Sequence, residues 1–150
     1  MIEFREIRPF EHLELMEPML VDHWLALGSF PDLAPLKPDF ATIIALDENG
    51  KLMSIGAFDG DELVGYSINV MTNWLHSADV LMCQNMVIWL DVKYRAGANG
   101  LKLIRETERL AKAKGCGVFL CGAKDDTVMF ELLPKLKYTV HETVYARVLA

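Results

Sequence analysis

The segment MVIWLDVKYRAGANGLKLIRETERLAKAK, which spans residues 86–114, decides the fold of this chain. Its first five residues form a continuous apolar run, which predicts a short buried strand. Residues 93–100 then bring together two glycines and two cations. Beyond Gly100 the apolar residues recur with the helical period and form one face: Leu103, Ile104, Thr107, Leu110 and Ala111. Gly115 follows the last periodic residue, where a helix commonly ends. The segment therefore predicts a strand, a basic glycine loop and an amphipathic helix.

A glycine loop that opens a helix has a direct physical use. The first N–H groups of a helix lack intrahelical partners, and the helix dipole is positive at that end. The loop exposes these groups, and Lys93 and Arg95 add positive charge, so the segment suits a phosphate or a pyrophosphate. The alternative is that the glycines only allow a tight turn and that both cations are solvated.

Composition narrows the class of protein. The chain has 150 residues, of which 52% are hydrophobic and 24% charged, so a globular protein with a sizeable core is expected. The net charge is −6 and no block rich in lysine and arginine stands out, which argues against a nucleic-acid partner. No apolar run approaches the roughly 18 residues that span a membrane, and the start MIEFREIRPFEH does not resemble a signal peptide. We therefore expect a cytoplasmic protein without a membrane partner.

Cysteine and histidine usage predicts no metal site. The three cysteines, Cys83, Cys116 and Cys121, lie in apolar runs and are expected to be buried free thiols. The four histidines lack the spacing of a zinc site.

Pattern along the whole chain predicts an α/β (α+β) fold, a mixed sheet with helices on both faces. Strands are expected at residues 2–8, 51–58, 62–70, 79–90, 117–121, 138–141 and 143–149. Helices are expected at residues 11–27, 38–46, 100–114 and 124–135, and residues 28–38 should be irregular. Asp59-Gly60-Asp61 predicts a hairpin turn, and Asp125 or Asp126 is expected to cap the last helix.

The glycine loop resembles the acetyl-coenzyme A motif of the GNAT N-acetyltransferases, in which a strand leads into Arg/Gln-x-x-Gly-x-Gly/Ala and then a helix. Arg95 matches the first position and Gly100 the last, while Ala98 replaces the middle glycine and Gly97 stands one place early. Residues 54–70, SIGAFDGDELVGYSINV, resemble the hairpin that precedes the cofactor strand in that family. The predicted element order also matches, so the resemblance covers nearly the whole chain, and its size is similar to that of phage-type members.

The resemblance implies a single domain, residues 1–150, with a mostly antiparallel central sheet. It also implies that the protein transfers an acetyl group from acetyl-CoA to a primary amine. The acceptor would be a small molecule or a protein, recognised by loops at residues 24–40 and 71–76. A homodimer is compatible with the family, and the setting would be a bacterial or phage-infected cytoplasm. By match to the family, the cofactor would contact the cofactor strand and the loop: Ile88, Trp89, Leu90, Arg95, Ala96, Gly97, Ala98, Asn99 and Gly100.

The catalytic residues stay unknown from the sequence. Where many members carry a glutamate, this chain has Gln84 and Asn85, which cannot take a proton but could position a water. Leu133 stands where many members have a tyrosine that acts as general acid, and it cannot donate a proton. Tyr138 and Tyr145 either pack on the sheet or supply that acid at the thiolate.

Three interpretations remain open. The first is an N-acetyltransferase that relies on positioning and a water relay. The second is a catalytically inactive GNAT-fold protein that binds CoA or a macromolecule, and the third is a small α/β protein for another phosphorylated ligand. His23 is either a partly buried helix residue or a substrate contact.

Overall fold

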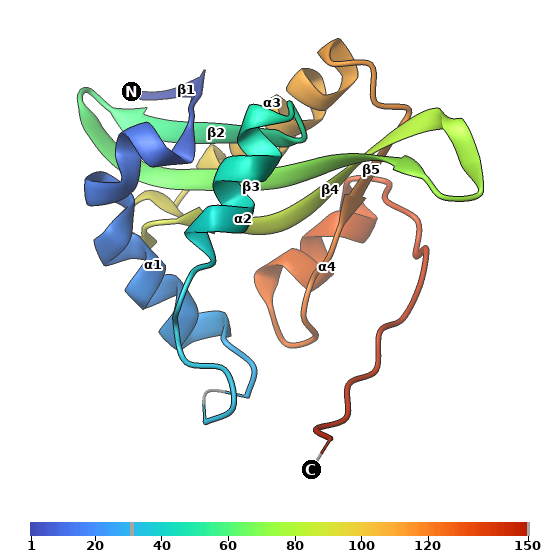
Figure 1. The fold of residues 1–150 in the computed structure, drawn as a ribbon. Helices are drawn as coiled ribbons and strands as arrows, with labels where there is room; N and C mark the ends of the chain where they lie inside the picture. Colours follow the sequence, from blue (N-terminus) through green and yellow to red (C-terminus); the bar gives the residue numbers. More distant parts are fainter. Residues whose placement is uncertain (31, 150) are drawn as a thin grey trace.

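The computed structural model describes residues 1–30 and 32–149 and contains one five-stranded sheet in the order β1-β2-β3-β4-β5. The strands are β1 (Ile2–Glu6), β2 (Leu52–Asp59), β3 (Glu62–Trp74), β4 (Ser77–Leu90) and β5 (Val118–Cys121). The first four pair antiparallel, and β5 runs parallel to β4 (Figure 1). The mixed, mostly antiparallel sheet expected from the sequence is confirmed.

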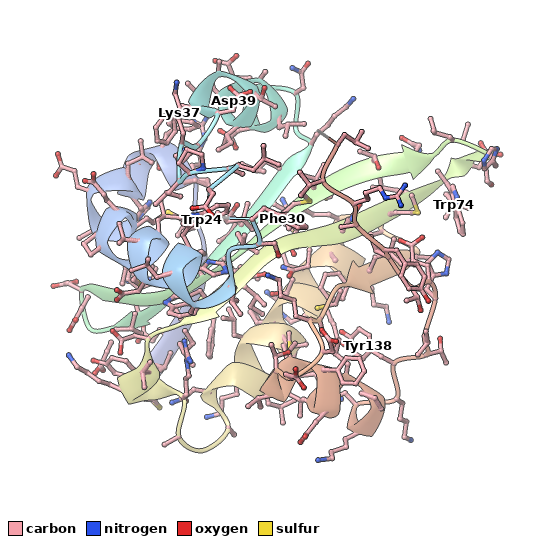
Figure 2. The ribbon with its side chains drawn as sticks, turned by 90° about the horizontal axis from the view of Figure 1, so that it is seen from below. Trp24, Phe30, Lys37, Asp39, Trp74 and Tyr138 are labelled. Carbon is pink, nitrogen blue, oxygen red and sulfur yellow. The ribbon has the colours of Figure 1, made fainter. Side chains whose placement is uncertain are left out.

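Helices cover both faces of this sheet. They are α1 (Leu13–Leu27), α2 (Phe40–Glu48), α3 (Asn99–Ala113) and α4 (Val128–Lys135), with short 3-10 turns η1 (Pro9–His12) and η2 (Val92–Tyr94). Figure 2 shows α1 and α2 on one face and α3 and α4 on the other. None of the helices in the described part of the chain is both long and apolar enough to cross a membrane.

The core has one layer on each face of the sheet. Between α1 and the sheet, Met16 and Met19 of the helix pack against Phe58, Tyr66 and Trp89 of the strands, and all five are buried. On the opposite face α3 buries Leu103, Ile104, Thr107 and Ala111, as its helical period predicts, while Leu110 is half-buried. Because helices cover both faces, β2 is buried along almost its whole length instead of alternating.

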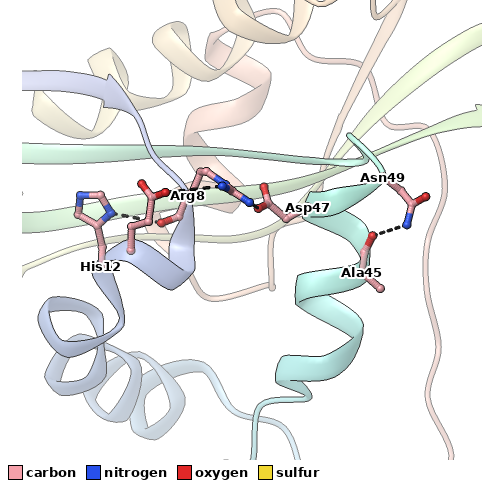
Figure 3. Close-up of polar contacts among 6 residues, drawn as sticks. Arg8, His12, Ala45, Asp47 and Asn49 are labelled. Carbon is pink, nitrogen blue, oxygen red and sulfur yellow. Dashed lines mark hydrogen bonds and ion pairs between the residues drawn. The ribbon is translucent and has the colours of Figure 1, made fainter.

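Polar contacts fix the start of the second helix. Asp39 caps α2 by accepting a hydrogen bond from Thr42 N at 3.1 Å, so the helix begins at Phe40 and runs two residues beyond the predicted end. Figure 3 shows the Arg8 guanidinium donating to Asp47 of α2, with Nε 2.8 Å from the carboxylate. This pair ties α2 to the segment that follows β1.

The expected loop at residues 28–38 is irregular wherever it is described, and Pro31 lies outside the described residues. The predicted cap of α4 is wrong. Thr127, not Asp125 or Asp126, accepts from Phe130 N, because Asp126 occupies a left-handed turn with φ of 63° before the helix.

The two C-terminal strands predicted at residues 138–141 and 143–149 are also wrong. This segment contains no strand, and its last part leaves the sheet as an extended chain (Figure 1), with Val140 and Val144 more than 80% exposed. Alternation in a sequence shows only that a segment can pair. The pairing itself needs a neighbouring strand, and in the described structure β5 pairs only with β4.

Candidate functional site

The candidate site lies where β4 and β5 diverge. The two strands pair only from Met82–Asn85 to Val118–Cys121, whereas β4 continues to Leu90. Residues 87–90 are therefore paired with β3 on one side and, among the described residues, have no strand on the other. The predicted contact residues Ile88, Trp89 and Leu90 occupy this unpaired part, whose main-chain groups can accept an added extended segment.

A β-bulge begins the unpaired part of β4. Ile68 pairs with Val87 and Asn69 with Asn85, so Met86 has no partner opposite it. The Asn85 amide bridges the irregularity, because Nδ2 lies 2.8 Å from Asn69 Oδ1 and 3.0 Å from Val87 O. Ser67 Oγ, at 3.2 Å, belongs to the same network. Asn85 thus holds the bulge through its NH2 group, which faces protein oxygens.

The glycine loop presents a row of unpartnered N–H groups. Within the described structure the backbone N–H groups of residues 96–101 make no hydrogen bond, and the first helical bond of α3 runs from Lys102 N to Ala98 O at 2.9 Å. Gly97 has φ of 75°, which favours glycine, whereas Ala98 has φ of −102° and needs none. The displaced glycine of the motif therefore stands where the backbone requires it, and the loop suits an anion.

Arg95 holds this loop to the end of the strand. Its Nε donates to Leu90 O at 2.7 Å, and its guanidinium carbon lies 4.3 Å from the centre of the Trp89 ring. The side chain is nevertheless exposed, so its terminal nitrogens remain open to an anion. Arg95 both positions the loop and adds charge beside it.

A histidine from α1 packs against the same strand. The His23 ring stacks on Trp89 with centroids 5.0 Å apart and planes 16° from parallel, and its Nδ1 lies 3.1 Å from Tyr66 Oη. Burial, followed by the charges of Arg95 and Lys124, lowers the pKa of His23. Burial also raises the pKa of Tyr66, so the phenol keeps its proton. Sequence reasoning singled out His23 but missed Tyr66, since no local pattern links residues 43 positions apart.

The chain after β5 is tied to the same helix. Lys124 Nζ donates to Leu27 O and to Ser29 Oγ, the latter at 2.8 Å. This contact joins the β5 side of the divergence to the end of α1.

The candidate acids from the α4 region do not reach the unpaired strand. Leu133 is buried and apolar. Tyr138 donates to Glu108 of α3 and packs edge-on against Phe119, and burial and then Glu108 raise its pKa. Tyr145 is 90% exposed in the C-terminal segment. Tyr138 thus contacts α3 and β5, and the tyrosine beside the unpaired part of β4 is Tyr66, opposite Trp89.

Among the described residues no cluster of histidine, cysteine and carboxylate side chains could hold a metal, and the three cysteines are free thiols. A cavity of about 270 Å³ lined by Arg5, His12 and Phe58 lies away from the residues of the candidate site.

Comparison with known proteins agrees with this geometry. No family model and no curated protein sequence matches the chain. Solved structures do match: an aminoglycoside acetyltransferase from an uncultured soil metagenomic sample superposes with a TM-score of 0.75 at 18% identity, covering 100% of this chain and 99% of that one. The fold is that of the GNAT acetyltransferases.

Two further structures match over most of their length. A ribosomal-protein-alanine N-acetyltransferase from Brucella melitensis biovar Abortus 2308 has a TM-score of 0.74 at 14% identity, with both chains fully covered. The aminoglycoside N-acetyltransferase AAC(6')-Iy, solved with CoA, has a TM-score of 0.71 at 18% identity and is covered over 95% of its chain, against 99% of this one. At these identities the likeness establishes the fold and leaves the activity open.

Proposed function

We propose that this protein is an N-acetyltransferase that moves an acetyl group from acetyl-CoA to a primary amine. One observation carries the proposal: the unpaired end of β4 leads directly into a loop of six unpartnered N–H groups at the start of α3. An extended amide chain joined to a pyrophosphate, which is the shape of CoA, matches this pair of features. The CoA complex of a structural neighbour supports the same donor.

The contacts follow from the backbone. The pantetheine amides pair with Ile88, Trp89 and Leu90 as an added strand would. The pyrophosphate lies against the N–H groups of Ala96, Gly97, Ala98, Asn99 and Gly100, beside the Arg95 side chain, and the positive end of the α3 dipole stabilises it.

Binding to CoA tests the proposal. Gly97→Asp puts a negative charge into the loop, whereas Gly97→Asn, nearly the same size and also tolerant of positive φ, puts none there. Two like charges about 5 Å apart at an effective dielectric of about 20 repel by about 3 kcal/mol, so Gly97→Asp should weaken CoA binding more than about 100-fold.

Gly97→Asn should weaken binding far less, because a side chain at this position meets no atom within 4 Å. Calorimetry with CoA, ADP and inorganic pyrophosphate measures these affinities. Equal CoA affinities for the two variants would refute the assigned site. Tight binding of ADP or pyrophosphate without CoA would favour another phosphorylated ligand.

The chemistry needs a neutral amine, and no glutamate or aspartate lies in the unpaired part of β4. The acceptor therefore loses its proton to water or binds already neutral. At pH 7 only about one in 2,500 molecules of a lysine-like amine of pKa about 10.4 is neutral, so the rate should rise about tenfold per pH unit. CoA binding without transfer to any amine in a broad panel would instead support the inactive GNAT-fold protein.

The acceptor class, a small amine or a protein amine, follows from neighbours that are named as aminoglycoside and ribosomal-protein acetyltransferases. The irregular loop after α1 and the tip of the β3–β4 hairpin, where Trp74 lies (Figure 2), are the acceptor-facing segments of the proposal. The proposal also includes a single domain over residues 1–150, assembly as a homodimer, and a location in a bacterial or phage-infected cytoplasm.

A further inference from the structure

The proposed acetyl transfer gives no role to the imidazole of His23, which contacts the hydroxyl of Tyr66. His23 lies on α1 and stacks on Trp89, in the unpaired part of β4. Its Nδ1 contacts Tyr66 Oη at 3.1 Å, and its Nε2 makes no hydrogen bond within the described structure. Nε2 is also absent from the fully buried unpartnered atoms found there, which comprise only Ser54 Oγ, so Nε2 of the half-buried His23 keeps some contact with solvent.

The burial of Tyr66 decides which ring nitrogen carries the proton. Tyr66 is 0% exposed, and Nδ1 of His23 is its one hydrogen-bond partner in the described structure. A buried hydroxyl that donates no hydrogen bond leaves the full cost of its desolvation without compensation. The Tyr66 O–H must therefore donate to Nδ1, which leaves the proton of a neutral imidazole on Nε2.

The surroundings keep this imidazole neutral. Arg95 and Lys124 are the charged groups that face it, both are cations, and with burial they lower its pKa. The Tyr66 hydroxyl is the other titratable group in contact, and it stays protonated. The exposed N–H, with two cations beside it, suits an oxygen that gains negative charge and does not suit an ammonium group.

We propose that His23 Nε2–H donates a hydrogen bond to the carbonyl oxygen of the thioester and stabilises the oxyanion formed during transfer, with Tyr66 as the positioning residue that fixes the tautomer. This role rests on the proposed acetyltransferase function.

The step balances without any other reactant. The amine nitrogen attacks the carbonyl carbon and forms the C–N bond, and the carbonyl electron pair moves to the oxygen held by His23. The pair then returns, the C–S bond breaks, and the thiolate takes a proton from water. The new amide nitrogen gives its extra proton to water.

Nuclear magnetic resonance of the ¹⁵N-labelled full-length protein tests the donor directly. The free protein should show His23 protonated at Nε2 and unprotonated at Nδ1. Acetyl-CoA should shift the Nε2–H signal, whereas CoA, which lacks the thioester carbonyl, should leave it nearly unchanged. A proton on Nδ1 at neutral pH, or equal responses to the two ligands, would overturn the proposal while leaving CoA binding intact. If calorimetry finds no binding of either ligand, both this inference and the proposed function fall.

Variants separate the donor from the packing. The pair His23→Phe with Tyr66→Phe keeps the stack on Trp89 and leaves no buried hydroxyl without a partner. It should lower kcat by about 100-fold, the usual effect of losing one oxyanion donor, with little change in KM. His23→Gln retains an N–H donor and should recover part of the loss. Wild-type kcat in the double variant would overturn the role, even if the protein proves to be an active acetyltransferase.

Discussion

Replacing Asn85 by aspartate tests the network that shapes the unpaired end of β4. The amide Nδ2 faces acceptors only: Asn69 Oδ1 at 2.8 Å, Val87 O at 3.0 Å, Ser67 Oγ at 3.2 Å and Ile68 O at 3.4 Å. Asn85→Asp keeps the shape of the side chain but removes both N–H donors and turns a carboxylate toward these oxygens. An orphaned buried group costs about 1–3 kcal/mol, and an uncompensated buried charge about 3–5 kcal/mol. Because Asn85 is half-buried, we expect the free energy of unfolding to fall by about 3 kcal/mol at neutral pH.

The loss should depend on pH in a defined direction. The oxygens around the new carboxylate raise its pKa in the folded state above the unfolded value of about 3.9, so the folded state binds more protons. The variant should therefore lose stability, relative to wild type, as pH rises from about 4 through the raised value. A protonated carboxyl still donates one hydrogen bond, so the deficit should shrink near pH 4.

Urea denaturation followed by tryptophan fluorescence measures both effects. The adjacent Gln84→Glu is the matched control, because it makes the same change from amide to acid on an exposed side chain of the same strand. It should shift the free energy of unfolding by less than about 0.5 kcal/mol. An Asn85→Asp variant as stable as this control at neutral pH would refute the network as described.

Three further predictions concern the core, the buried histidine and the thiols. Leu103→Ala, at a side chain only 1% exposed, should lower the free energy of unfolding by about 3 kcal/mol, whereas Leu110→Ala on the half-buried edge of the same helix should cost clearly less; equal losses in urea melts would contradict the packing of α3. The lowered pKa of His23 means that the unfolded state binds its proton more readily, so stability should drop as pH falls below about 6.5, and His23→Gln should flatten that drop; parallel stability curves would count against it. Burial raises the pKa of Cys83 to about 12 and of Cys121 to about 11, so a thiol reagent at about pH 8 should react slowly with the native protein and rapidly in urea; fast native labelling of both would show that they are accessible.

Local patterns in the sequence determined much of this fold. The Asp59-Gly60-Asp61 turn places β2 beside β3, because the turn type is set by residues next to one another. The apolar face of α3 follows from the helical period, and the loop that precedes this helix follows from the glycines. These features depend on interactions within a few positions, so a single sequence contains them.

Only the tertiary structure decided what distant segments do. The strand-like alternation of residues 138–149 found no partner, because pairing requires a neighbour that local pattern cannot supply. Local pattern also gave no sign that the NH2 group of Asn85 joins the bulge in β4 to two residues of β3. His23 and Tyr66 meet because α1 packs across the sheet, and the burial of one then sets the tautomer of the other. The sequence predicted the four helices, the five paired strands and the glycine loop, whereas hydrogen-bond partners and proton positions depended on contacts between residues far apart in the chain.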